Sequence, residues 1–137
     1  MKVKLRKADK KFTELVRRIY DYTCQRCGKR YVIDGVKVGN LANLGVSHYW
    51  SRRHEATRFD LDNVTLFCNF PCHTGENGWE CEKKSGEYYN YMIKRLGQKG
   101  FDLLEFRAHQ YQKKDDFTIL LWIEQELGDM PSVQKRC

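Results

Sequence analysis

The chain has little proline, no long apolar run and no low-complexity linker. Only 2 of its 137 residues are proline, and no apolar stretch approaches the roughly 18 to 20 residues that cross a bilayer. Charged residues make up 31% of the chain and hydrophobic residues 41%, which excludes a membrane-spanning protein and a wholly disordered one. Nothing marks a second domain, so we expect a single domain over residues 1–137 that buries its own core.

The first residues of the sequence also lack an apolar run. The chain starts Met1-Lys2-Val3-Lys4, and no hydrophobic segment of the kind found in secretory signals follows it. We therefore expect a cytoplasmic protein whose 6 cysteines are reduced thiols rather than disulfides. In a reducing compartment, cysteines paired at short spacing are typical of a metal site.

Basic residues are concentrated at one end of the chain. The net charge is +7, and residues 1–30 alone carry 11 Lys or Arg and 3 Asp or Glu. Such a segment suits a polyanionic partner such as DNA. The candidate phosphate contacts are Lys10, Arg17 and Arg18, followed farther along by Arg52, Arg53 and Arg58. We interpret the three later arginines as substrate contacts rather than as a solvated loop.

Hydrophobic periodicity divides the chain into three parts and predicts an α+β fold. Residues 1–23 form a basic segment with a helix over 9–22. Residues 24–80 hold the paired cysteines, strands over 46–51 and 64–67, and short strands or loops over 29–47. Residues 81–137 are predicted to hold three helices and a loose tail. The first helix spans 87–96 and stops at Gly97, the second spans 101–112, and the third runs from the N-cap residue Asp115 to Gly128. We interpret Tyr88, Tyr89 and Met92 as core rather than as a base-stacking platform.

Four cysteines form two chelating pairs. Cys24 and Cys27 form a CxxC, and Cys68 and Cys72 form a CxxxC after a gap of 40 residues. Each short pair can bind one edge of a tetrahedron, and the long gap lets the two pairs meet, so we predict a structural zinc. Two alternatives stay open, because either Cys81 or His73 could replace Cys72 as a ligand. Cys137 is interpreted as incidental.

A second constellation consists of His48, Asn63 and His73. Asn63 follows His48 by 15 residues, and His73 adjoins Cys72. With these residues, the stretch 24–73 resembles the zinc-containing HNH endonucleases, and the run 47–63 is similar to small HNH proteins of phages and prophages. In that family a CxxC knuckle precedes a β-hairpin that bears His and Asn, and a second cysteine pair ends in Cys-His at the start of a helix.

The resemblance implies a small zinc-stapled ββα-metal core and metal-dependent cleavage or nicking of DNA, in the cytoplasm of a bacterial host if the protein is of phage or prophage origin. It makes His48 the general base, His73 a ligand of a catalytic divalent ion (Mg²⁺, Mn²⁺ or Ni²⁺), and Asn63 a clamp that holds the hairpin loop. Asn63 could instead be only a turn residue. We interpret His54 and His109 as ordinary polar residues.

These roles agree with what phosphodiester hydrolysis requires. A water nucleophile must lose a proton, and charge must be stabilised at the phosphorus and on the departing oxygen. A neutral imidazole suits the first task, and a divalent ion suits the second.

Two features depart from the family pattern. The second knuckle, Cys68-Asn69-Phe70-Pro71-Cys72-His73, has an extra residue, and residues 74–78 resemble a loop inserted before a later helix. Many members also carry an acidic residue immediately before the first histidine, where this chain has Ser47. We therefore expect a weaker or differently ligated ion, with a hydroxyl, water or Asp62 as the substitute. The principal alternative function is a non-catalytic, zinc-bound DNA-binding module with a degenerate site, and a weaker one is a protein-interaction zinc domain.

Overall fold

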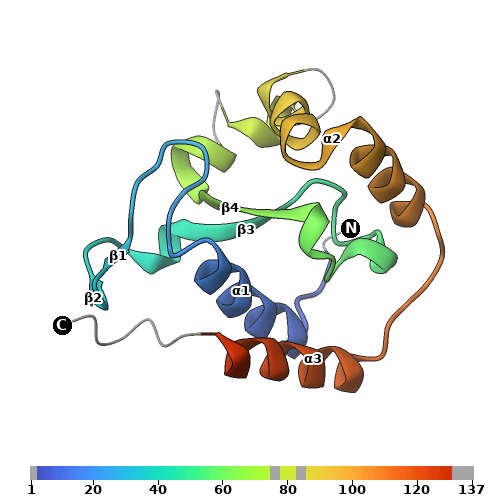
Figure 1. The fold of residues 1–137 in the computed structure, drawn as a ribbon, viewed down its shortest axis with the longest axis horizontal. Helices are drawn as coiled ribbons and strands as arrows, with labels where there is room; N and C mark the ends of the chain where they lie inside the picture. Colours follow the sequence, from blue (N-terminus) through green and yellow to red (C-terminus); the bar gives the residue numbers. More distant parts are fainter. Residues whose placement is uncertain (1–2, 75–77, 83–85, 131–137) are drawn as a thin grey trace.

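An antiparallel hairpin of β3 (Leu44–His48) and β4 (Val64–Cys68) lies at the centre of the fold (Figure 1). The structure is a computed structural model that describes residues 3–74, 78–82 and 86–130. Leu44 pairs with Cys68 at one end of the hairpin, and His48 pairs with Val64 at the other. The predicted strands are confirmed, although β3 ends at His48 rather than at residue 51. The hairpin thus places the second cysteine pair and His48 near opposite ends.

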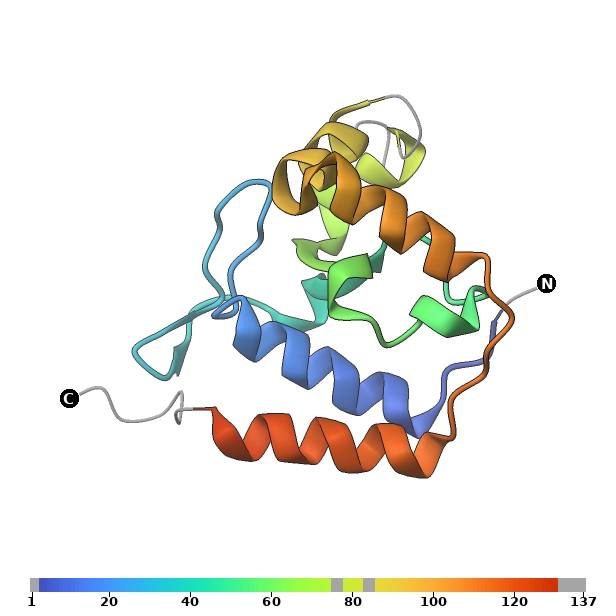
Figure 2. The same cartoon turned by 45° about the vertical axis from the view of Figure 1, so that its right-hand side comes forward.

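Helix α1 (Lys7–Ile19) covers one face of the hairpin. Its apolar residues recur at helical spacing, and Phe12, Leu15 and Val16 are buried. Helix α3 (Asp116–Asp129) lies along the far side of α1 (Figure 2). The Asp115 carboxylate accepts a hydrogen bond from the Thr118 amide at 3.1 Å, so the predicted N-cap is confirmed. The basic helix is therefore covered on two sides.

Helix α2 (Glu87–Ala108) packs on the opposite face of the hairpin (Figure 1). Tyr88 and Met92 are fully buried, which confirms their assignment to the core. The two helices predicted over 87–96 and 101–112 form one element that breaks at Gly97, which has a φ of 75°. Glycine adopts this left-handed conformation without the steric cost that a Cβ imposes. The chain turns there and resumes its helix at once.

The remaining elements are short. Strands β1 (Val32–Ile33) and β2 (Val36–Lys37) form a separate antiparallel pair in the stretch predicted as short strands or loop. The connection between β3 and β4 contains the helical turns η2 (Glu55–Thr57) and η3 (Leu61–Asn63). Turn η1 (Leu41–Asn43) precedes β3, and η4 (Asn69–His73) and η5 (Trp79–Glu82) follow β4. No helix in the described part of the chain is both long enough and apolar enough to cross a membrane.

Candidate metal centre and histidine groove

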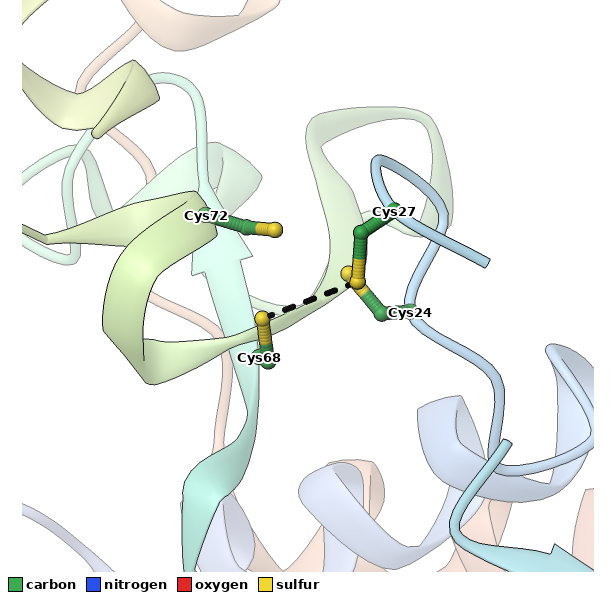
Figure 3. Close-up of side chains that lie close together, drawn as sticks. All are labelled: Cys24, Cys27, Cys68 and Cys72. Atoms are coloured by element: carbon green, nitrogen blue, oxygen red, sulfur yellow. Dashed lines mark hydrogen bonds between the residues drawn. The ribbon is translucent and has the colours of Figure 1, made fainter. Parts of the chain in front are cut away.

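The four predicted zinc ligands converge. Cys24, Cys27, Cys68 and Cys72 have Sγ atoms that all lie within 4.8 Å of one another, and the Cys27 and Cys68 sulfurs are 4.0 Å apart (Figure 3). Sulfurs that share a tetrahedral zinc at about 2.3 Å lie about 3.8 Å from each other. The donor set and its spacing therefore fit a structural metal such as zinc.

Backbone hydrogen bonds shape the two cysteine knuckles. Gly28 has a φ of 78°, and its amide donates to the Cys24 carbonyl at 2.9 Å, which closes a tight turn. The Gln25 amide donates to Leu66 of β4 at 2.9 Å. Arg26 connects the two knuckles directly, since its Nη1 donates to the Cys72 carbonyl at 2.8 Å. The ligands are thus positioned by contacts that do not involve their sulfurs.

The electrostatics of the cluster favour a cation. Burial raises the pKa of Cys24, but nearby backbone amides outweigh it and lower that pKa to about 7. Burial and the sulfurs around them raise the pKa values of Cys68 and Cys72. Four sulfurs this close repel one another as thiolates, and a divalent ion among them removes that cost.

Of the two residues that could replace Cys72 as a zinc ligand, the structure decides on His73 but not on Cys81. Cys72 belongs to the cluster, whereas His73 lies half-buried outside it. The side chain of Cys81 and the whole of Cys137 fall outside the described residues. Among the side chains that the structure describes, the four cysteines form the one group of three or more potential metal ligands.

A groove of about 610 Å³ lies beside β3 and contains both histidines of the second constellation. It is lined by Val3, Leu5, Val46, His48, Ser51, Arg52, His73 and Glu80. Val46 and His48 reach it because alternate residues of a strand share a face. We call this feature the histidine groove.

His48 is held in one tautomer. Its side chain is 7% exposed, and Nε2 lies 2.8 Å from the Arg58 carbonyl oxygen. A carbonyl can only accept a hydrogen bond, so Nε2 carries the proton and Nδ1 carries the lone pair. Nδ1 is buried and has no hydrogen-bond partner among the described residues. Burial first, and then the charge of Arg52, lower the pKa of His48 to about 4, so the ring is neutral at pH 7.

Asn63 makes the contacts expected of a clamp. Its Nδ2 donates to the carbonyls of Trp50 at 2.8 Å and Thr57 at 3.0 Å, and its Oδ1 accepts from the Trp50 amide at 2.8 Å. The side chain is fully buried. One amide thereby joins both ends of the loop that follows His48.

The two residues considered as substitutes for the missing acid lie elsewhere. Ser47 points to the other face of β3, where its hydroxyl lies 2.8 Å from the Tyr88 hydroxyl in the core. Asp62 forms an ion pair with Arg107 at 3.2 Å and does not line the histidine groove. Neither Ser47 nor Asp62 lines the groove, whereas Ser51 is a hydroxyl residue that does, so the expectation of a substitute ligand stays a prediction. Successive side chains of a strand point to opposite faces, so the sequence alone already places Ser47 and His48 on different faces of β3.

The predicted DNA contacts divide into accessible and engaged residues. Lys10 and Arg53 are exposed, and Arg52 is half-buried and lines the histidine groove, with its Nε 3.6 Å from Asp9 Oδ1. Arg58, by contrast, is 2% exposed and bonded to Asp9. Its prediction as a phosphate contact is wrong, because its guanidinium already has buried partners.

The other two basic residues of α1 make contacts within the chain. Arg17 donates to the Leu41 and Leu44 carbonyls at 2.8 Å each, so it joins α1 to the start of β3. Arg18 lies 3.5 Å from the Met130 carbonyl. Both side chains are half-buried.

Sequence reasoning missed two acidic residues. Glu80, on η5, is exposed. Among the described residues that line the histidine groove, it is the one with a carboxylate side chain. Asp9 is 4% exposed at the first turn of α1. Glu80 has no local signal for its role. The one local signal for Asp9 is that it occupies the capping position three residues after Arg6.

Comparison with protein-family models, curated proteins and solved structures finds no match for this chain. The functional argument therefore rests on the residues and their geometry.

Proposed function

We propose that this chain is an HNH-type endonuclease that hydrolyses DNA phosphodiester bonds with the help of a divalent ion. The observation that carries the proposal is that His48 and His73, which the resemblance assigns as base and metal ligand, line one groove together with Arg52. In this reading β3, β4 and the turn η4 form a shortened ββα-metal core, and the cysteine cluster holds structural zinc at the far end of the hairpin.

His48 is suited to accept a proton from water. The Nδ1 lone pair is its free basic site, because Nε2 is bonded to Arg58. A phosphate brought into the groove raises the pKa of His48, since negative charge favours the protonated ring. Water then attacks phosphorus, its proton passes to Nδ1, and the bond from phosphorus to the leaving sugar oxygen breaks.

His73 and Glu80 are the groove residues that we assign to the catalytic ion. Imidazole and carboxylate suit Ni²⁺, Mn²⁺ and Mg²⁺, in decreasing order of preference for nitrogen ligands. A bound divalent ion supplies stabilisation of the charge that develops on the phosphate and the leaving oxygen. Glu80 thus takes the place of the acid that the family carries where this chain has Ser47.

A non-catalytic DNA-binding module is the second candidate. It is favoured by Ser47, whose hydroxyl is committed to Tyr88 in the core. In that case the groove and its arginines contact DNA without cleaving it.

Cleavage of supercoiled plasmid with Mg²⁺, Mn²⁺, Ni²⁺ or EDTA separates the two candidates. We expect ion-dependent nicking or linearisation by the wild type, and a loss of about 10² to 10⁴ fold in His48→Ala. His109→Ala is the matched control, because that exposed histidine bonds to Glu105 of its own helix. A wild-type protein that binds DNA but is inert with every ion favours the binding module.

Mn²⁺ binding, followed by electron paramagnetic resonance, tests the ion site without relying on activity. We expect His73→Ala and Glu80→Gln each to weaken Mn²⁺ binding by about tenfold or more. Asp62→Asn removes a carboxylate of equal charge outside the groove and should leave binding unchanged. If Asp62→Asn weakens binding and Glu80→Gln does not, our assignment of Glu80 is wrong.

A further inference from the structure

A single main-chain carbonyl determines how His48 is oriented. The Arg58 carbonyl accepts from His48 Nε2 at 2.8 Å, and that bond leaves Nδ1 as the basic nitrogen. A shift of this carbonyl would release the ring and let the proton move to either nitrogen. What holds the Arg58 backbone therefore also holds the tautomer of His48.

The Arg58 side chain anchors that backbone in the interior. Its Nε donates to Asp9 Oδ1 at 3.0 Å and its Nη2 to Asp9 Oδ2 at 2.6 Å, which is a two-point contact between planar groups. Nη2 also donates to the Lys4 carbonyl at 2.9 Å, and Nη1 lies 3.4 Å from Glu55. Arg58 is 2% exposed and Asp9 is 4% exposed, so water does not compete for these bonds.

Asp9 is itself fixed by helix α1. Its Oδ2 accepts from the Arg6 amide at 2.7 Å in the first turn of the helix. The ion pair therefore ties the loop after His48 to an element 49 residues away in sequence. Asn63 holds the adjacent peptide by donating to the Thr57 carbonyl at 3.0 Å. Asn63 therefore holds Thr57, and Asp9 holds its neighbour Arg58. Arg58 is the residue whose carbonyl bonds to His48.

Stability alone is a poor explanation for this pair. Desolvating two charges offsets much of their attraction, and a well-packed apolar pair of similar volume is often at least as stable. Orientation is a better explanation, because a two-point ion pair fixes direction as well as distance.

We propose that Asp9 and Arg58 are positioning residues that hold His48 in its Nε2-protonated tautomer, with Nδ1 free to act as the base. The catalytic consequence rests on the proposed nuclease function, whereas the tautomer itself does not.

The test measures the tautomer directly by ¹⁵N NMR of the imidazole nitrogens at pH 7, with the His48 signals identified by their loss in His48→Gln. We expect the wild type to show one Nε2-protonated form. Asp9→Asn and Arg58→Lys should show a mixture of tautomers, because the carbonyl is released. Glu55→Gln weakens the 3.4 Å contact with Arg58 and the 2.7 Å ion pair with Arg6 but leaves the contacts between Asp9 and Arg58 in place. It should therefore give a smaller change, and it provides a milder variant to measure if a stronger one does not fold.

Arg107→Met is the matched control. Arg107 pairs with Asp60 at 2.9 Å and Asp62 at 3.2 Å in the same loop, and its ion pairs do not include Arg58 or His48. The variant should keep the wild-type tautomer even if its melting temperature falls. In plasmid cleavage, Arg58→Lys, which keeps the 3.6 Å ion pair between Arg52 and Asp9, should lower kcat by about tenfold or more with KM unchanged, and should have no further effect in a His48→Ala background.

The outcomes separate this inference from the proposed function. Folded Asp9→Asn and Arg58→Lys proteins that keep the single wild-type tautomer overturn the inference, whether or not the protein cleaves DNA. A mixed tautomer in both variants, together with an inert wild type, supports the positioning role and contradicts the nuclease proposal. An equal change in Arg107→Met overturns the inference, because it would show a general response to loosening the loop.

Discussion

At the scale of single residues, the buried His48 of the histidine groove makes the stability of the fold depend on pH. Its pKa falls from the ordinary 6.5 to about 4 because the ring is buried and faces Arg52. Between these two pH values the unfolded chain binds a proton that the folded chain does not, so acid favours unfolding. The contribution is fully present above about pH 6.5 and is lost as the pH falls towards 4.

We therefore predict that His48 accounts for roughly 3 kcal/mol of destabilisation between pH 7 and pH 4. Denaturant unfolding of the wild type and of His48→Gln at several pH values measures it as the difference between the two proteins. The cysteine cluster titrates in both and cancels from that difference. Parallel curves for the two proteins across this range would falsify the assignment of a buried, neutral His48.

Asp9 responds to acid in a separate range. Burial raises its pKa, but the hydrogen bonds from Arg58 and Arg6 and the nearby positive charges lower it below 3.8 overall. Its contribution is present above about pH 4 and is lost as the pH falls through the lowered value. The two groups can therefore be distinguished by pH alone.

At the scale of elements, Gly97 decides how α2 runs. It has a φ of 75°, and no atom lies within 4 Å of where a Cβ would be, so the backbone conformation alone opposes a side chain. We predict that Gly97→Ala lowers the free energy of unfolding by about 1 kcal/mol or more.

Gly128→Ala provides the comparison for that change. Gly128 lies inside α3 and its added Cβ also meets nothing, but its backbone is helical. Alanine there should be neutral or stabilising by up to about 1 kcal/mol. Similar losses in both variants, measured by chemical denaturation, would show that the break at Gly97 is not maintained in solution.

Elements with a local signal could be predicted from the sequence, and contacts between distant residues could not. The spacing of Phe12, Leu15 and Val16 predicts α1, and the Asp115 cap predicts where α3 begins. Helix α1 ends earlier than expected because Asp21 and Tyr22 have φ values of 52°. Glycine at 97 correctly predicts an interruption, but not that the helix resumes immediately.

In the candidate site too, residues with a local sequence pattern could be predicted and contacts between distant residues could not. The cysteine spacing predicts the cluster, because chelation imposes its own local pattern. The sequence predicts Arg58 as a substrate contact because its partner Asp9 lies 49 residues away, and no local pattern distinguishes a buried arginine from an accessible one. Glu80 was missed because its place depends on the path of the chain after Cys72.

At the scale of the whole molecule, the cysteine cluster joins the segment after α1 to the end of the hairpin. We predict about one zinc per chain by elemental analysis, and a lower melting temperature when a ligand is lost, because binding free energy contributes to folding. Cys24→Ser and Cys72→Ser should lose the metal, and Cys81→Ser should keep it. Loss of zinc from Cys81→Ser but not from Cys72→Ser would contradict the ligand set.

The positive charge of the molecule is less available than the sequence indicates. Much of the excess lies in residues 1–30, but Arg17 is bonded to main-chain carbonyls, and α1 is flanked by α3, which carries acidic and no basic residues. Arg6 forms an ion pair with Asp116 of α3 at 3.1 Å. Arg52, which lines the histidine groove although it also lies 3.6 Å from Asp9, and the exposed Arg53 therefore remain the proposed DNA contacts.

We predict that DNA affinity falls steeply with salt and discriminates little between sequences, because phosphate contacts release counterions whatever the base. Replacing Arg52 and Arg53 together by Gln should reduce the slope of log K against log salt by about 2, or about 0.9 per lost contact. Lys94→Gln with Lys99→Gln removes the same charge from exposed positions on α2 and should change the slope much less. Fluorescence anisotropy over a salt series measures both. Equal slopes for the two double variants would show that net charge, rather than the histidine groove, governs binding.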